Sequence, residues 1–313
     1  MQFRRLALAA SSILFAAGLG FAAGPGVAGS APAAKKLVVA VSVLPQAYFV
    51  ERVGGDRVRA FALVGPGQSP HSYEPSPRQM AELGQASLWL TVGIEFEHGL
   101  EPKVARLYPA LRIRDNAAGV VFRRLEEHHH EEGEQHEEGE EESGGHDEGE
   151  DGRDPHAWLG RQGSKAMAAE IRDALSLLDP SGAAAYARNY EALARDIDAV
   201  FAGLVAKLGS LKGRPVFVYH PAFGYFLDEF GIEQVAVETG GKEPTQKGLS
   251  ALVARAKAEK AAAVFVQAQF PTAAARSLAS SIGAAVVPID DLAPDWLSNL
   301  ARMGEALLKA ARP

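Results

Sequence analysis

The sequence predicts an α/β protein with two lobes of mostly parallel sheet. Short runs rich in β-branched residues alternate with Ala-rich amphipathic segments, which is the pattern of strand–helix units. One long helical stretch near the middle of the chain breaks this alternation. The 313 residues are enough for an export signal and two domains of ordinary size.

Residues 1–34 predict a cleaved signal peptide. The basic pair Arg4-Arg5 precedes a mostly apolar run from Leu6 to Ala23, and Ala31-Pro32-Ala33 fits a cleavage site. A membrane anchor is the alternative, but glycines interrupt the run and it is only marginally long enough to span a bilayer. The chain has no cysteine that could carry a lipid. We therefore expect a periplasmic protein whose mature chain does not insert into the membrane.

The strand and helix patterns place the first lobe at residues 35–178 and the second at residues 211–313. Buried parallel strands are expected at Leu37–Val43, Val58–Val64, Leu88–Val92, Val216–Tyr219, Val235–Val237, Ala263–Val266 and Ala285–Ile289. Helices are expected at Pro75–Ala86, Gln246–Ala258 and Thr272–Ile282.

Residues 179–210 predict a long helix between the lobes. Asp179-Pro180-Ser181 is a helix-start signal, and Gly209 follows the last turn. Apolar and aromatic residues recur at steps of three or four and form one continuous face: Tyr186, Tyr190, Leu193, Ile197, Phe201, Leu204 and Leu208. We interpret this helix as a rigid spine joining the lobes; the alternative is a surface helix packed on one domain.

A His- and Glu-rich insert occupies residues 126–153. It holds 14 acidic residues and five of the nine histidines, namely His128, His129, His130, His136 and His146. Such a segment cannot bury enough apolar surface to offset its ordering entropy. Imidazoles and carboxylates are ligands of divalent transition metals, so the insert is a candidate auxiliary metal-binding segment. An acidic solubilising loop is the alternative.

Three histidines outside the insert have distinctive neighbours. His71 lies in a loop after the second strand, His156 lies in Asp154-Pro155-His156-Ala157-Trp158, and His220 follows the strand at Val216–Tyr219. Ligands of open α/β sheets bind beyond the carboxyl ends of strands, so His71 and His220 should face one cleft. A proline beside each histidine helps to fix the backbone. His98 has no such context and is expected on the surface.

A fourth metal ligand is expected from the second lobe. Asp290 directly follows the last predicted strand, at a place equivalent to that of His220. The alternative role for Asp290 and for Asp291 is to cap the terminal helix. Glu74, Asp154 and Tyr73 are candidates for orienting a ligand imidazole, or for cap and turn roles.

These motifs together resemble a known family, the zinc- and manganese-specific solute-binding proteins of ABC transporters, in particular the zinc-uptake (ZnuA-like) group. The resemblance runs from Val39 to about Leu308 and is carried by Pro70-His71-Ser72-Tyr73-Glu74-Pro75, Asp154-Pro155-His156-Ala157-Trp158, Tyr219-His220-Pro221-Ala222-Phe223-Gly224-Tyr225-Phe226, Glu243-Pro244-Thr245, Val266-Gln267-Ala268-Gln269-Phe270 and Ile289-Asp290-Asp291-Leu292. The sequence departs from many members in having no cysteine, and so lacks a disulfide that some zinc-type members carry in the second lobe.

The resemblance implies two Rossmann-like lobes joined by a rigid spine helix, with the metal held in the interlobe cleft. It implies His71, His156 and His220 as ligands, with a carboxylate or water in fourth place. It also implies a membrane permease with a cytoplasmic ATPase as the partner. We expect the protein to be a monomer.

Zinc is the expected metal. Three imidazoles and one oxygen ligand suit tetrahedral Zn²⁺, whereas Mn²⁺ favours more oxygen ligands. In the resembling manganese proteins the position of His220 is often a carboxylate. A member of the same family that binds manganese or another divalent metal is an alternative, and so is a His-rich periplasmic metal buffer or adhesin.

Other function classes find less support in the sequence. Three histidines and a water also describe a catalytic zinc site, but the chain lacks H-E-x-x-H, G-x-S-x-G and a glycine-rich phosphate loop. Its basic residues are scattered without an aromatic–basic module, so nucleic-acid binding is not expected. We therefore do not expect an enzyme.

Overall fold

The computed structural model describes residues 36–125, 152–238, 242–270 and 273–311. The predicted signal peptide and residues 126–151 of the predicted insert lie outside the described residues. The five histidines of the insert therefore also lie outside them.

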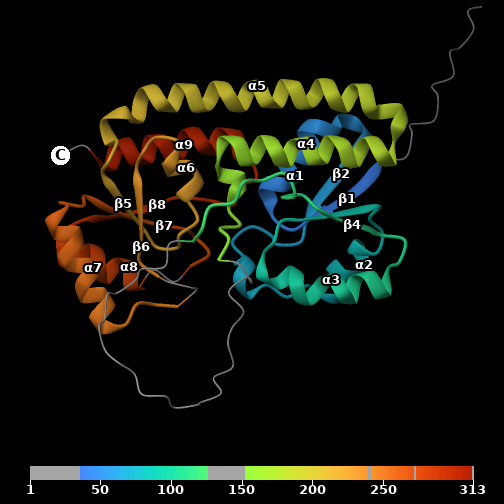
Figure 1. Cartoon of the computed structure of the whole chain (residues 1–313). Coiled ribbons are helices and arrows are strands. Elements are labelled where there is room, and N and C mark those ends of the chain that lie inside the picture. The colour runs from blue at the N-terminus through green and yellow to red at the C-terminus, as the bar shows by residue number, and fades with distance from the viewer. Residues whose placement is uncertain (1–35, 126–151, 239–241, 271–272, 312–313) are drawn as a thin grey trace, which may run out of the picture. The chain divides into compact units, whose positions relative to one another are not determined.

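Two four-stranded sheets form the framework, one in each lobe (Figure 1). Every strand pairing within both sheets is parallel. The strands of the first sheet are β1 (Leu37–Val41), β2 (Val58–Ala62), β3 (Leu88–Thr91) and β4 (Arg112–Asp115). Those of the second are β5 (Pro215–Val218), β6 (Glu233–Ala236), β7 (Ala263–Val266) and β8 (Ala285–Pro288).

The two sheets have the same topology. Their strand orders are β2-β1-β3-β4 and β6-β5-β7-β8, so in each lobe the chain steps first to one side of the opening strand and then to the other. This reversal leaves a crevice at the carboxyl ends of the strands, which is where open α/β sheets bind ligands. The connections after β2, β3, β4, β5, β6, β7 and β8 supply the candidate site residues.

Helices cover the sheets and connect the strands. The first lobe contains α1 (Leu44–Gly54), α2 (Pro77–Leu83), α3 (Glu95–Leu107) and α4 (Arg161–Leu178). The second contains α6 (Gly224–Asp228), α7 (Gln246–Ala258), α8 (Ala273–Ile282) and α9 (Trp296–Ala310). Local sequence explains several starts: the Ser76 hydroxyl accepts the Gln79 N–H at the start of α2, and the Thr245 hydroxyl accepts the Gly248 N–H at the start of α7.

The long helix α5 (Ala183–Leu208) joins the two lobes (Figure 1). It packs on α1 and α4 of the first lobe and on α9 of the second. Its buried residues belong to the face that the sequence predicts, with Tyr190 only partly buried. The two-lobed α/β fold with a long connecting helix is therefore confirmed.

The largest apolar cluster is continuous across the lobes. It includes strand residues of the first sheet, the buried face of α5, and residues of α6 and α9. Phe49 of α1 meets Trp296 of α9 edge to face, with ring centroids 4.7 Å apart. The lobes thus share a core.

The bounds of several elements differ from the sequence-based expectation, and so do one strand and the end of the insert. Strand β4 was not predicted, because its residues Arg112-Ile113-Arg114-Asp115 are mostly polar and it lies at the sheet edge. Gly152 and Arg153, assigned to the insert, belong to the folded body. The Leu125 N–H donates to the Gly152 carbonyl, and Arg124 and Arg153 form an antiparallel bridge.

Within the described ranges, no helix combines the length and the apolar character that crossing a membrane requires.

Candidate metal centre

His71 enters the site from the connection after β2. It is the middle residue of a short 3₁₀ turn, Pro70–Ser72, whose first position is a proline. Proline fixes φ near the helical value and so favours this turn. The His71 side chain is 23% exposed, the most open of the three histidines.

His156 lies immediately before a second 3₁₀ turn, Ala157–Leu159, at the start of α4. The Asp154 carboxylate oxygen Oδ1 accepts both the His156 backbone N–H at 3.0 Å and the hydrogen on its ring Nδ1 at 2.8 Å. The ring meets Trp158 edge to face at 5.2 Å between centroids. The backbone and the ring of His156 are therefore held by one buried carboxylate.

His220 follows strand β5 and is buried. The Gln267 side-chain amide donates to its carbonyl oxygen at 3.3 Å. The Phe270 ring stacks on its imidazole, with centroids 4.6 Å apart. Both neighbours lie in the connection after β7, so the second sheet supplies this histidine and the residues that support it.

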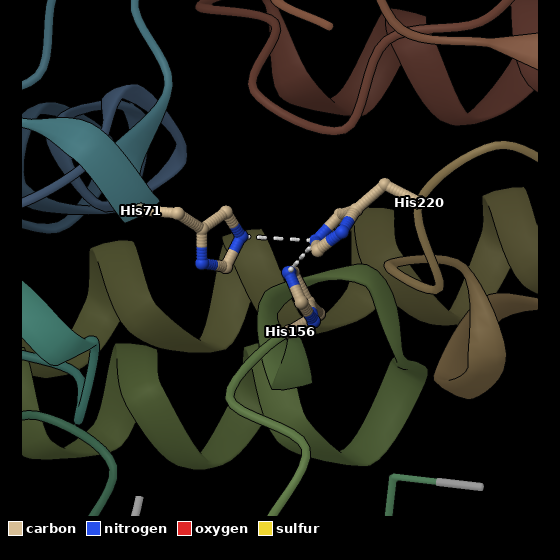
Figure 2. A group of neighbouring side chains, drawn as sticks. All are labelled: His71, His156 and His220. Atoms are coloured by element: carbon tan, nitrogen blue, oxygen red, sulfur yellow. Dashed lines mark hydrogen bonds between the residues drawn. The ribbon is translucent and has the colours of Figure 1, made fainter. Parts of the chain in front are cut away.

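The three imidazoles converge on one point (Figure 2). The Nε2 atom of His220 lies 3.1 Å from Nε2 of His71 and 3.2 Å from Nε2 of His156. One ring nitrogen from each histidine lies within 4.8 Å of the other two. Zinc–imidazole bonds of about 2.0–2.1 Å in a tetrahedron place ligand nitrogens about 3.3 Å apart. The spacing therefore fits three ligands of one ion.

Each imidazole directs its Nδ1 atom at a carboxylate. His71 Nδ1 lies 3.1 Å from both oxygens of Glu95, and His220 Nδ1 lies 2.5 Å from Oε1 of Glu238. Asp154 takes the same role for His156. A carboxylate accepts hydrogen bonds and donates none, so each Nδ1 carries the hydrogen and each Nε2 presents its lone pair to the centre. This tautomer is the one that binds a metal through Nε2.

The charges around the site act differently on two of the histidines. Burial alone would lower the pKa of His71, but its hydrogen bond and ion pair with Glu95 raise it above the ordinary 6.5. Burial opposes ionisation of Glu95, yet the partnership with His71 lowers the pKa of Glu95 to about 2. Burial, with the neighbouring imidazoles, lowers the pKa of His220 well below 6.5. His220 is therefore neutral and ready to bind at physiological pH.

The structure does not bring Asp290 into the group of histidines. Asp290 is exposed, and its Oδ1 accepts the Leu292 N–H at 2.8 Å. Its neighbour Asp291 is buried, and its charge acts on both His71 and His156. Neither residue caps the terminal helix, because the N-cap position of α9 is Asp295. The acid beside the histidines is therefore Asp291, one residue after the expected Asp290.

Of the three candidates for orienting a ligand imidazole, one contacts a histidine as expected and two have other surroundings. Asp154 contacts His156 as expected, whereas Glu74 is exposed and Tyr73 packs its ring on Phe96 at 4.9 Å. The partners of His71 and His220 are Glu95 and Glu238, which the sequence reasoning missed. A usable signal was present, because these carboxylates follow β3 and β6 as the histidines follow β2 and β5. His98 is exposed, as expected.

Proteins of similar sequence and structure carry zinc-uptake names. A family model described as "ZnuA: Zinc-uptake complex component A periplasmic" matches residues 39–310. The high-affinity zinc uptake system protein ZnuA of Paracoccus denitrificans is 33% identical over 274 residues, which are 82% of each chain. The crystal structure of a ZnuA deletion mutant with zinc bound has a TM-score of 0.78 and 30% identity, covering 89% of this chain and 100% of that one.

A longer relative matches over only part of its length. The zinc-binding lipoprotein AdcA of Streptococcus pneumoniae is 27% identical over 254 residues, which are 79% of this chain and 48% of AdcA. The chain thus spans about half of that relative. The family match, in contrast, takes in both sheets and all three histidines. The chain belongs to the ZnuA family of zinc-uptake component A proteins.

Proposed function

We propose that this protein captures Zn²⁺ between its two lobes and delivers it to a membrane permease. The observation that carries the proposal is the convergence of three Nε2 lone pairs, each backed by a carboxylate on Nδ1. A carboxylate behind a ligand imidazole raises its basicity and fixes its orientation, which is the arrangement of tight metal sites. Membership of the ZnuA family supports transport rather than catalysis.

Zinc is the metal that the donor set favours. Three nitrogen donors at tetrahedral spacing suit Zn²⁺, whereas Mn²⁺ prefers oxygen ligands in larger number. Relatives of at least 30% identity with zinc in their names support the same choice. We propose a water or the Asp291 carboxylate for the fourth position, since Asp291 is the buried acid whose charge acts on the histidines.

The proposed setting is the periplasm. The predicted signal peptide at residues 1–34 and the family description both support export. The proposed partner is an ABC-type permease driven by a cytoplasmic ATPase, and the protein is proposed to act as a monomer. We propose that the histidines of residues 126–151 form an auxiliary site that raises the local zinc concentration or responds to high zinc.

The experiment is a competitive zinc titration against a chelator, performed on the protein with residues 126–151 deleted. One tight zinc per chain is expected. His71→Ala, His156→Ala and His220→Ala should each weaken it by at least about 10–100-fold, the usual cost of disturbing even a supporting group of a metal site. His98→Ala is the matched control, because this histidine is exposed and lies in the first lobe, as His71 and His156 do. Loss of tight binding with the deletion alone, and no effect of the three substitutions, would contradict the proposal in favour of a metal buffer.

A further inference from the structure

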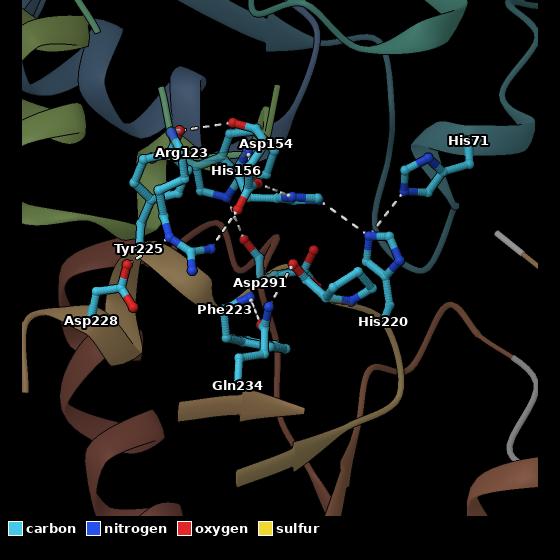
Figure 3. Close-up of polar contacts among 12 residues, drawn as sticks. His71, Arg123, Asp154, His156, His220, Phe223, Tyr225, Asp228, Gln234 and Asp291 are labelled. Carbon is cyan, nitrogen blue, oxygen red and sulfur yellow. Dashed lines mark hydrogen bonds and ion pairs between the residues drawn. The ribbon is translucent and has the colours of Figure 1, made fainter. Parts of the chain in front are cut away.

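Beside the histidines, four residues form a polar cluster that crosses between the lobes: Arg123, Asp154, Tyr225 and Asp228 (Figure 3). We call this set the Arg123 cluster. Arg123 and Asp154 belong to the first lobe, on the two segments that flank residues 126–151. Tyr225 and Asp228 lie on α6, a few residues after His220. The cluster thus connects Asp154, which contacts the candidate ligand His156, to α6, which follows the candidate ligand His220.

The Asp154 carboxylate divides its two oxygens between different partners. Oδ1 accepts from His156, and Oδ2 accepts from Nη1 of Arg123 at 3.1 Å. The Asp154 side chain is 0% exposed, so no bulk water is available to replace either partner. Because the carboxylate is planar, a hydrogen bond at each oxygen fixes its rotation. Arg123 therefore sets the angle at which Asp154 meets the His156 ring.

The other end of the guanidinium is tied to the second lobe. The Nε atom of Arg123 donates to Oδ2 of Asp228 at 2.6 Å. A Cβ atom added at Gly224 would lie 1.5 Å from Nη1 of Arg123, so the absence of a side chain at this position makes room for the guanidinium. The start of α6 is in this way shaped to receive Arg123.

The Tyr225 hydroxyl joins the same two segments through their backbones. It accepts the Arg123 N–H at 2.8 Å and donates to the Asp154 carbonyl at 2.9 Å. The Asp154 N–H in turn donates to the Arg123 carbonyl at 2.9 Å. A Cβ at Gly160 would lie 2.9 Å from the Tyr225 Cβ, so Tyr225 also packs closely on the far side of the His156 turn.

We propose that Arg123 is a positioning residue of the metal centre. Arg123 fixes Asp154, and through Asp154 also His156, to α6 of the opposite lobe. This fixes the position of His156 relative to His220. This inference rests on the proposed function, since it assigns His156 as a ligand. Because Asp154 bonds both Arg123 and His156, the Arg123–Asp154 ion pair is part of the binding site rather than a surface salt bridge.

The test compares Arg123→Met with Arg114→Met in the zinc titration. Arg114 makes a partly buried ion pair with Glu170 in the first lobe, with its Nη2 2.8 Å from Oε2, and so controls for the loss of such a pair elsewhere. Arg123→Met should raise the zinc Kd by about 10–100-fold, as for other groups that orient metal ligands. Arg114→Met should leave it unchanged. An unaltered Kd in Arg123→Met would overturn the proposal.

A double-mutant cycle separates positioning from a general structural role. In a His156→Ala background, Arg123→Met should have no further effect on the Kd, because the ligand through which it acts is absent. Equal weakening in both backgrounds would overturn the proposal. The visible spectrum of the Co²⁺-loaded protein should also change in Arg123→Met, since it reports ligand geometry.

Gly224→Ala provides a second variant that keeps every polar group. Its methyl group should displace the guanidinium and weaken zinc binding in the same direction, so the proposal remains testable if Arg123→Met does not fold. The two levels of failure are distinct. If the three histidine substitutions weaken binding and both Arg123→Met and Gly224→Ala do not, only the positioning role fails. If the histidine substitutions have no effect, the proposed function fails.

Discussion

At the scale of single residues, the proposed metal centre consists of pairs: a histidine that presents Nε2 and a carboxylate that accepts the hydrogen on Nδ1. Glu95 and His71 act on each other's ionisation: Glu95 raises the pKa of His71, and the pKa of Glu95 falls to about 2. His220, in contrast, is kept neutral by burial. Proton competition at this site is therefore expected to begin at His71 rather than at His220.

Glu95→Gln should make zinc binding less dependent on pH. Zinc binds neutral imidazole, so affinity is lost as pH falls through the pKa of His71. Removing the charge of Glu95 lowers that pKa, and the loss then begins at a lower pH. A glutamine oxygen can still accept the Nδ1 hydrogen, so binding at about pH 8 should weaken by no more than about 10-fold. The measurement is the zinc Kd between about pH 5.5 and pH 8.

Glu74→Gln is the matched control for this series, because Glu74 is exposed and close in sequence to His71. Its pH profile should follow the unsubstituted protein. An equally steep profile in Glu95→Gln would show that Glu95 does not govern the titration of His71.

Asp291→Asn and Asp290→Asn should behave differently although the residues are adjacent. Asp291 is buried beside the histidines, with Oδ1 2.8 Å from the Gln269 amide, whereas Asp290 is exposed. Asp291→Asn should weaken zinc binding by about 10–100-fold, and Asp290→Asn should have little effect. Equal effects of the two changes would contradict this assignment.

Asp291→Asn should also change the stability of the metal-free protein in a predictable direction. Burial raises the pKa of Asp291 above 3.8. The fold therefore loses stability as pH rises from the unfolded pKa to the folded pKa of this group, and the cost is complete above the folded pKa. Metal-free Asp291→Asn should therefore unfold at the same or a higher temperature at neutral pH. The residue would then be retained for binding rather than for folding.

The residues of the site were predictable where a local pattern marked them. His71, His156, His220 and Asp154 each lie in a Pro-containing motif beside a predicted strand or turn. The choice between Asp290 and Asp291 was not predictable, because adjacent side chains leave a strand end in different directions and sequence alone does not fix which one faces the cleft.

At the scale of secondary-structure elements, α4 approaches the His156 turn so closely that there is no room for a side chain at Gly163. A Cβ atom at Gly163 would lie 2.2 Å from the Ala157 carbonyl oxygen, which belongs to the backbone of that turn. No rotamer change can relieve such a clash, so the turn or the helix must move. The glycine thus determines where His156 stands relative to the rest of the lobe.

Gly163→Ala should lower the free energy of unfolding by about 1–3 kcal/mol, the usual cost of overpacking, although alanine favours helices by about 1 kcal/mol. It should also weaken zinc binding, because the displaced turn carries His156. Gly203→Ala in α5 is the control: nothing lies within 4 Å of the added Cβ, and the change should stabilise the protein by about 0.5–1 kcal/mol. Urea unfolding of the metal-free proteins measures both. Equal stability changes would mean that the contact is not restrictive.

Most elements were predictable because their patterns are strong. The predicted bounds of β7 and α7 agree with the structure, and both have uninterrupted local signals. Strand β4 was missed because an edge strand with arginines at two of four positions lacks the apolar run that marks the other strands. Its pairing with β3 is a long-range fact that no local pattern contains.

At the scale of the whole molecule, α5 and the shared apolar core link the two lobes. Helix α5 contacts elements of both lobes, and Phe49 packs on Trp296 across the boundary. The sequence predicted the spine from its continuous apolar face, but not which residues of the two lobes would touch. Burial in a common core should restrict hinge opening, so we expect only small lobe movements on zinc binding.

The most direct test of the account is X-ray absorption spectroscopy at the zinc edge, using the zinc-loaded protein with residues 126–151 deleted. We expect one zinc per chain with three imidazole nitrogens at about 2.0–2.1 Å and one oxygen ligand. His220→Ala should remove one imidazole from the spectrum. A six-coordinate, oxygen-rich shell, or a spectrum that does not change in His220→Ala, would contradict the assignment of His71, His156 and His220 as the metal centre.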